Sequence, residues 1–212
     1  MLEAAPWVYF AVGVHPHAAV EFGPILESTI TSPLTHPRCV ALGETGLDYF
    51  RMLTPAATQL TAFTRQLRLG LAFSKPLVIH SRDAEPDTLA TLTEIVPRSD
   101  PIHMHCFTGS AAFARDLLEK FEYIYFGFTG VVTYHTAGVI QGVVERVVPL
   151  DRILLETDAP YMPPVRVGER KGGVAHCGMV PVVAGKIAEL KGVTVDEVIR
   201  RTRANARAVY GI

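Results

Sequence analysis

Short apolar segments alternate with amphipathic ones along the whole chain, and this alternation most constrains the fold. The apolar segments predict six β-strands, at residues 8–14, 39–43, 76–80, 102–106, 123–128 and 153–156. The segments between them have helical spacing. One helix is expected to have Thr54 as its cap and Pro55 as its first residue, and the last to begin with Thr194 and Glu197 at capping-box spacing. Such alternation is typical of an α/β fold with a parallel sheet.

Polar side chains that can bind metals stand at the carboxyl end of five of the six predicted strands. They are His15, Glu44, His80, His105 and Asp158. In a barrel of parallel strands the carboxyl ends share one face, and active sites lie there. A doubly wound sheet also gathers ligands at strand ends, but it usually carries a glycine-rich phosphate loop, and the sequence has none. The pattern therefore favours a TIM-type (β/α) barrel.

Composition limits the class of protein. The 212 residues are 49% hydrophobic and 19% charged, which predicts a globular chain, and the length fits a single domain over residues 1–212. A net charge of -1 provides no overall field that attracts nucleic acid, so a polyanion has to be bound locally. Three cysteines without close spacing fit a reducing compartment. Neither a membrane span nor a leader is predicted, so a cytoplasmic or nuclear location without membrane attachment is expected.

Four of the side chains at strand ends form a ligand set for a divalent ion such as Zn²⁺, Mn²⁺ or Mg²⁺. The set comprises Glu44, His80, His105 and Asp158. Such an ion lowers the pKa of bound water, and Glu44 could bridge two ions, so one or two are expected. Each residue alone is more often structural, and only the recurrence at strand ends supports the metal interpretation. The neighbouring His103 and Cys106 are interpreted as core residues.

Seven segments of the chain resemble, in the same order, the signatures of the TatD-type metal-dependent deoxyribonucleases, a family of amidohydrolase-like barrels. The segments are GVHPH, ALGETGLDYFR, KPLVIHSRDA, HCFTGS, YFGFTG, RILLETDAPYMPP and NARAVYGI. Each is weak alone, but together they cover essentially the whole chain. The resemblance therefore predicts membership of that family.

The resemblance implies roles for particular residues. Glu44 matches a carboxylate shared between two metals, and Asp158 matches a metal ligand that is also the partner of the attacking water, so both are expected to be catalytic. The ligands of one metal match His80 and His105. The positions around the substrate phosphate match His15, Arg51 and Arg82.

One signature of the family has no counterpart in the sequence. Members usually open with a strand that ends in a His-x-His pair of metal ligands, and a full barrel has eight strands in about 250 residues. An incomplete barrel of about six strands is therefore expected, with exposed strand edges through which copies could form a homo-oligomer. His15 and His17 could replace the missing pair. Alternatively, the predicted coding sequence could be truncated or could use an alternative start. These alternatives stay open.

The expected function is metal-dependent hydrolysis of phosphodiester bonds, as in an exonuclease-type deoxyribonuclease. A metal-bound hydroxide beside arginines suits attack on phosphorus, with DNA ends or short single strands as the substrate. Arg166, Arg170 and Lys171 could add local contacts to phosphates. Two alternatives stay open: the same scaffold acting on another ester such as D-aminoacyl-tRNA, and a catalytically weak metal-binding protein.

Overall fold

The computed structural model describes residue 5 and residues 7–165 and 173–212, so Arg166, Arg170 and Lys171 lie outside the described residues. Two compact units make up the chain. The first comprises residues 1–103, 120–123 and 211, and the second comprises residues 104–119, 124–210 and 212. The predicted single domain stays a prediction. Within the described part of the chain, every helix is too short or too polar to span a bilayer.

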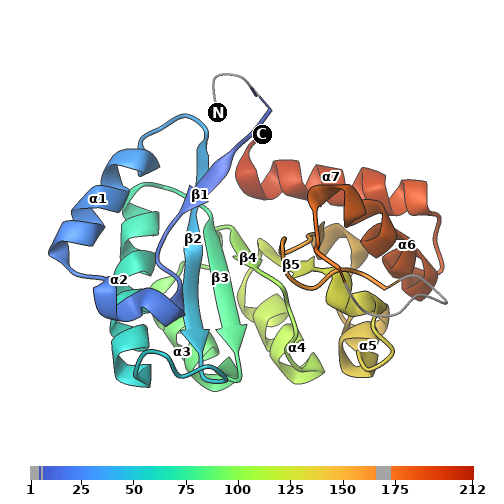
Figure 1. Ribbon diagram of the computed structural model, residues 1–212, viewed down its shortest axis with the longest axis horizontal. Helices are drawn as coiled ribbons and strands as arrows, with labels where there is room; N and C mark the ends of the chain where they lie inside the picture. The colour runs from blue at the N-terminus through green and yellow to red at the C-terminus, as the bar shows by residue number, and fades with distance from the viewer. Residues whose placement is uncertain (1–4, 6, 166–172) are drawn as a thin grey trace. The chain divides into compact units, whose positions relative to one another are not determined.

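The first unit is a parallel sheet with helices packed beside it (Figure 1). Its elements are β1 (Phe10–Val12), η1 (Pro16–Glu21), α1 (Pro24–Leu34), β2 (Cys39–Asp48), α2 (Ala56–Ala72), β3 (Leu77–Arg82) and α3 (Glu85–Ile95). Strand β2 pairs with β1 on one side and with β3 on the other, both in parallel. Apolar residues of α2 at helical spacing, Phe63 and Leu67, are fully buried.

The second unit has the same alternation of strands and helices. Its elements are α4 (Ala111–Lys120), β5 (Ile124–Phe128), η2 (Gly130–Thr133), α5 (Gly138–Arg146), η3 (Leu150–Arg152), β6 (Ile153–Leu155), η4 (Cys177–Met179), α6 (Val180–Lys191) and α7 (Val195–Tyr210). Strands β5 and β6 pair in parallel. The short strand β4 (Ile102–Met104) contains the junction of the two units.

The strands follow one another in sequence order, from β1 to β6. Parallel strands in sequence order, each followed by helical structure, are the arrangement of a (β/α) barrel, with six of its eight strands. The predicted fold class, an incomplete TIM-type barrel, is confirmed.

Strand β2 is longer than the sequence predicts. The predicted strand ended at Gly43, whereas β2 continues to Asp48 after a register shift between Leu42 and Thr45. Glycine within a strand can mark an irregularity or a close approach of another strand rather than an end. Gly43 and Gly46 have φ angles of 151° and 147°, which carry the strand through this irregular stretch. The expectation that Glu44 follows the strand is therefore wrong, because Glu44 lies inside it.

The predicted caps had different outcomes. Helix α2 begins at Ala56, so Pro55 precedes the helix, and the Thr54 hydroxyl donates to the carbonyl oxygen of His17 at 3.0 Å instead of capping. At the start of α7 the Thr194 hydroxyl accepts the amide hydrogen bond of Glu197 at 3.2 Å, as predicted. The Glu197 side chain pairs with arginines of its own helix rather than completing the capping box.

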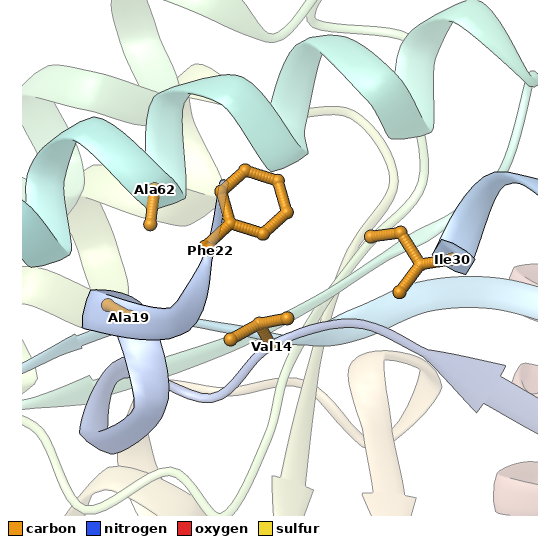
Figure 2. Packing of buried hydrophobic residues seen from close by; sticks show 5 residues of the cluster. All are labelled: Val14, Ala19, Phe22, Ile30 and Ala62. Atoms are coloured by element: carbon orange, nitrogen blue, oxygen red, sulfur yellow. The ribbon is translucent and has the colours of Figure 1, made fainter. Parts of the chain in front are cut away.

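Apolar packing fixes the segment that leads into the first histidine. Figure 2 shows the buried cluster that joins this segment to η1, α1 and α2, which comprises Val14, Ala19, Phe22, Ile30 and Ala62. The Gln66 side chain of α2 accepts from the Val14 amide at 2.7 Å and donates to the Val14 carbonyl at 3.0 Å. His15 therefore starts from a fixed backbone position.

In the second unit, α7 holds the start of β6. The buried residues of α7 recur at three- and four-residue spacing and line one face of the helix: Val198, Thr202, Asn205 and Val209. The Asn205 amide donates to the carbonyl oxygens of Leu150 and Ile153 at 2.9 and 2.8 Å. A buried cluster of Val209 with Tyr125 and Leu154 completes the contact.

Replacing Gly46 by alanine should lower the free energy of unfolding by at least about 3 kcal/mol, because overpacking and an unfavourable φ act together. A Cβ at Gly46 would lie 1.9 Å from the His80 carbonyl oxygen of the adjacent strand. Urea unfolding followed by circular dichroism measures the change. The control is Gly185→Ala in α6, where a Cβ meets nothing within 4 Å and where alanine should stabilise the helix by up to about 1 kcal/mol. Equal stability of the two variants would contradict this account of β2.

Candidate metal centre

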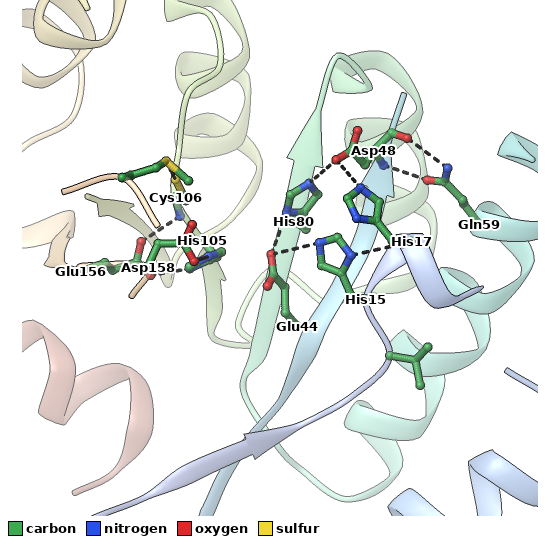
Figure 3. Close-up of polar contacts among 12 residues, drawn as sticks. His15, His17, Glu44, Asp48, Gln59, His80, His105, Cys106, Glu156 and Asp158 are labelled. Carbon is green, nitrogen blue, oxygen red and sulfur yellow. Dashed lines mark hydrogen bonds and ion pairs between the residues drawn. The ribbon is translucent and has the colours of Figure 1, made fainter. Parts of the chain in front are cut away.

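Three potential metal ligands of the first unit converge near the sheet (Figure 3). The Nδ1 atom of His80 lies 2.7 Å from Oε1 of Glu44, and Nε2 of His15 lies 3.9 Å from the same oxygen. The ligand atoms of the three side chains all lie within 4.8 Å of one another, and they form the group that could hold a metal ion among the described residues. Two imidazoles and one carboxylate are a common donor set for zinc and related ions.

A second carboxylate, Asp48, lies on the other side of His80. Its Oδ2 atom is 2.8 Å from Nε2 of His17 and 3.3 Å from Nε2 of His80 (Figure 3). The side chain is only 1% exposed. Its Oδ1 atom accepts a hydrogen bond from the Arg51 amide at 2.7 Å. Burial by itself raises the pKa of Asp48, but the hydrogen bonds from Arg51 and His17 and the charge of His80 outweigh it, so the pKa lies below its usual value.

Helix α2 fixes the backbone of Asp48. The Gln59 side chain accepts from the Asp48 amide at 2.8 Å and donates to the Asp48 carbonyl at 3.0 Å. The side-chain amide of Gln59 also donates to the carbonyl oxygen of Thr54 at 2.8 Å. Because Gln59 is fully buried, its hydrogen bonds are shielded from water, and they set the position of the carboxylate.

Two carboxylates, those of Glu44 and Asp48, face the two ring nitrogens of His80. A neutral imidazole carries one proton and can donate to only one of them. If Nε2 donates to Asp48, the lone pair of Nδ1 faces Glu44 Oε1 at 2.7 Å, and a cation shared between these two atoms makes the contact favourable. A carboxylate that orients a metal-binding histidine through its other nitrogen is a recurrent arrangement. Glu44 and His80 therefore fit a divalent ion.

His15 differs from His80 in its proton arrangement. It precedes η1, and its Nδ1 atom accepts a hydrogen bond from the His17 amide at 3.1 Å. The proton of the neutral ring is therefore on Nε2, the atom that faces Glu44. Burial, more than any neighbouring charge, lowers the pKa of His15 to about 4, so the ring is neutral near pH 7. This arrangement suits a hydrogen-bond donor better than a metal ligand.

A second cluster, in the second unit, repeats the pattern of the first (Figure 3). The Nδ1 atom of His105 lies 2.8 Å from Oε1 of Glu156, and the Cys106 amide donates to Oε2 of Glu156 at 2.8 Å. The other ring nitrogen of His105, Nε2, lies 3.5 Å from Oδ1 of Asp158. Glu156 thus orients His105 from one side, as Asp48 orients His80, and leaves Nε2 directed toward Asp158.

Cys106 belongs to the packing of the second unit. Burial, reinforced by the nearby Glu156 charge, raises the pKa of its thiol to about 12. The sulfur lies 3.5 Å from the Thr129 hydroxyl and 3.8 Å from the Met162 sulfur. A protonated thiol is a poor metal ligand, which agrees with the interpretation of Cys106 as a packing residue. His103 is also buried, as expected.

Both predicted arginines of the first unit lie close in the chain to residues of its cluster. Arg82 is the last residue of β3, two positions after His80, and its guanidinium carbon lies 3.8 Å from the centre of the Phe50 ring. Arg51 is exposed, and its amide is bound by Asp48. Their predicted role around a substrate phosphate stays a prediction.

The structure pairs the predicted ligands within each unit: Glu44 with His80 in the first, and His105 with Asp158 in the second. Their roles as ligands stay predictions. Sequence reasoning considered His17 only as a possible metal ligand, and it missed the orienting residues Asp48, Gln59 and Glu156. For Asp48 a signal was present, because it is four residues after Glu44, and even spacing keeps side chains of a strand on one face. Glu156 is two residues before Asp158, but the backbone is not extended at Asp158, where φ is 51°.

The fold and the paired histidines and carboxylates define a metal-dependent hydrolase class of barrel, and comparison with known proteins agrees. The chain belongs to the TatD related DNase family, whose family model matches residues 1–211. This confirms the family predicted from the seven segments.

Two relatives and one solved structure illustrate the similarity. The human 3'-5' RNA nuclease TATDN2 is 38% identical over 206 residues, which are 97% of this chain but only 27% of that protein. The uncharacterized metal-dependent hydrolase YabD of Bacillus subtilis is 35% identical over 212 residues, covering 100% of this chain and 81% of that protein. The crystal structure of YJJV, a TatD homologue from Escherichia coli K12, matches with a TM-score of 0.89 and 26% identity, over 100% of this chain and 80% of that one.

Proposed function

We propose that the protein is a metal-dependent hydrolase that cleaves phosphodiester bonds of nucleic acid. The observation that carries the proposal is the contact of Glu44 and His80 at 2.7 Å, with a buried carboxylate holding the other nitrogen of the histidine. When Nε2 donates to Asp48, the Nδ1 lone pair and the Glu44 charge are directed at one point, which fits a divalent ion. The family and the names of the two relatives support the same class of reaction.

The proposed ligands are Glu44 and His80 in the first unit and His105 and Asp158 in the second. A bound Mg²⁺, Mn²⁺ or Zn²⁺ ion, or a pair of ions, supplies a hydroxide near neutral pH and charge stabilisation at phosphorus. In the second unit Asp158 would accept the proton of the attacking water, and in the first unit the Glu44 carboxylate would supply negative charge to an ion beside His80. Asp48 and Glu156 keep the two histidines oriented.

The residues around the first-unit cluster are suited to bind a phosphate. His15 presents Nε2–H as a neutral donor, and Arg51 and Arg82 supply positive charge. Because the whole chain has a net charge of -1, these local groups are the ones that attract a polyanion. We propose DNA or RNA strand ends as the substrate, since the family is named for DNA cleavage and the human relative for RNA cleavage.

Cleavage of a labelled single-stranded oligonucleotide tests the proposal. We expect no cleavage in excess EDTA and recovery of cleavage when Mg²⁺, Mn²⁺ or Zn²⁺ is added back. Equal rates with and without the chelator would contradict a metal-dependent reaction. Failure to cleave both DNA and RNA with every one of these ions would contradict the proposed substrate class.

The proposal includes a location and an assembly. Cys39, Cys106 and Cys177 are free thiols, which supports a reducing compartment such as the cytoplasm or nucleus.

Strand β1 stands at the end of the strand order and is preceded by exposed apolar residues, including Trp7 at 75% exposure. An edge of this kind can pair with a second copy, so we propose a homo-oligomer. Sedimentation of the 212-residue chain should show a concentration-dependent dimer, and a monomer at all concentrations would contradict it.

A further inference from the structure

The loop that joins β2 to α2, residues 49–55, is fixed by hydrogen bonds to β2, β3 and α3. The Tyr49 amide donates to the Arg82 carbonyl at 2.8 Å, and the Tyr49 hydroxyl donates to the Asp87 carboxylate at 2.7 Å. The Arg51 amide donates to the Asp48 carboxylate at 2.7 Å. The backbone of the loop therefore has a defined position relative to β3 and Asp48.

This fixed loop nevertheless presents large apolar side chains to solvent. Phe50 is 58% exposed, Met52 is 52% exposed and Leu53 is 69% exposed. Phe50 differs from the other two because the Arg82 guanidinium is stacked over its ring at 3.8 Å. Since more than half of Phe50 is still exposed, a further planar group can reach the ring.

We propose that Phe50, with Arg82 stacked on it, is a subsite that binds an unpaired nucleobase of the nucleic-acid substrate. The inference rests on the proposed function and adds a binding determinant to it. An aromatic ring stacks on any base, because every base has a π-face, and an adjacent arginine adds a cation–π contact and attraction for the phosphate. Asp48 contacts both this loop, through the Arg51 amide, and the His80 ring, so the subsite adjoins the proposed metal ligands.

A subsite of this kind has consequences for specificity. A base inside a duplex is stacked on its neighbours and paired, so it cannot lie against Phe50. The subsite therefore favours single strands and unpaired ends over duplex interiors. The Phe50 ring itself does not select one base, because stacking is tolerant of sequence.

Binding to the metal-free protein measures the subsite without cleavage. The probe is a fluorescently labelled deoxyoligonucleotide of about six nucleotides, within the range that one protein groove holds, and the readout is anisotropy in excess EDTA. We expect Phe50→Ala to weaken binding by about 5- to 100-fold, the range found for loss of one stacked base. Phe50→Trp should bind as tightly as the wild type. A fully abasic strand of equal length should bind the wild type and Phe50→Ala equally weakly.

Leu53→Ala is the matched control, because Leu53 is an exposed apolar residue of the same loop. It should bind the natural strand like the wild type. Wild-type affinity in Phe50→Ala, or an equal loss on natural and abasic strands, would overturn the subsite. Cleavage by the wild type with added metal is scored separately. If the wild type cleaves no strand, the proposed function fails; if it cleaves but Phe50→Ala binds normally, only the subsite fails.

Discussion

Replacing Glu44 by glutamine should weaken metal binding and lower metal-dependent cleavage by at least about 100-fold, since loss of an orienting partner alone costs about 10- to 100-fold. Glutamine has nearly the same shape but no charge, so the point beside His80 Nδ1 no longer attracts a cation. The Glu44 side chain is 29% exposed, and the variant should remain folded. Calorimetric titration with Mn²⁺ and initial rates of cleavage measure the two effects.

Glu94→Gln is the control for this variant. Glu94 is an exposed carboxylate of α3 in the same unit, and its replacement should leave metal affinity and rate unchanged. If Glu44→Gln kept the wild-type metal affinity, Glu44 would not be a ligand. A loss of cleavage with unchanged metal affinity would restrict Glu44 to a role toward the substrate.

Replacing Asp48 by asparagine should lower metal affinity by about 10- to 100-fold, although Asp48 is not proposed as a ligand. Asparagine offers one acceptor where the carboxylate offers two, and it brings an amide donor toward the His17 and His80 rings, which themselves donate. The His80 ring then loses the contact that leaves Nδ1 free for the ion. Titration of the variant with Zn²⁺ in competition with a chromophoric chelator measures the affinity.

Asp87→Asn separates orientation from a general loss of charge in the first unit. Asp87 also accepts a hydrogen bond, but its donor is the Tyr49 hydroxyl at 2.7 Å rather than a proposed ligand, and its side chain is exposed. Its replacement should leave metal affinity within about twofold, as expected for a surface charge. A similar loss of metal affinity in both variants would show that Asp48 acts only through its negative charge and not by orienting His80. Unfolding curves of both variants verify that each is folded.

The alternation of the sequence was sufficient to predict the six strands and the barrel class, because buried parallel strands leave apolar runs that local patterning reveals. It was insufficient for β2. In the sequence, Gly43 and Gly46 indicate the end of a strand. In the structure, glycine is needed at both positions because β3 lies so close to them. A Cβ at Gly43 would meet Val78 at 2.6 Å, and one at Gly46 would meet the His80 carbonyl at 1.9 Å. Contacts between strands so distant in sequence have no local signature.

The candidate ligands could be predicted from the sequence, whereas the contacts of the residues that orient them could not. Glu44 and His80 each follow an apolar run, so their position relative to the strands marks them. Asp48 is recognised as part of the site only through His17 and His80, which are 31 and 32 residues away. Gln59 resembles any polar residue on a helix until its hydrogen bonds to Asp48 are seen. A pattern along the chain cannot contain these pairings.

The claim that Glu44 and His80 bind a divalent ion can be tested by anomalous diffraction from crystals of the protein grown with Zn²⁺. We predict an ion at about 2.0–2.2 Å from Oε1 of Glu44 and Nδ1 of His80, the distances typical of zinc–oxygen and zinc–nitrogen ligation. His80 Nε2 should keep its contact with Asp48. An anomalous peak elsewhere, with Glu44 and His80 still in direct contact at saturating zinc, would contradict the account.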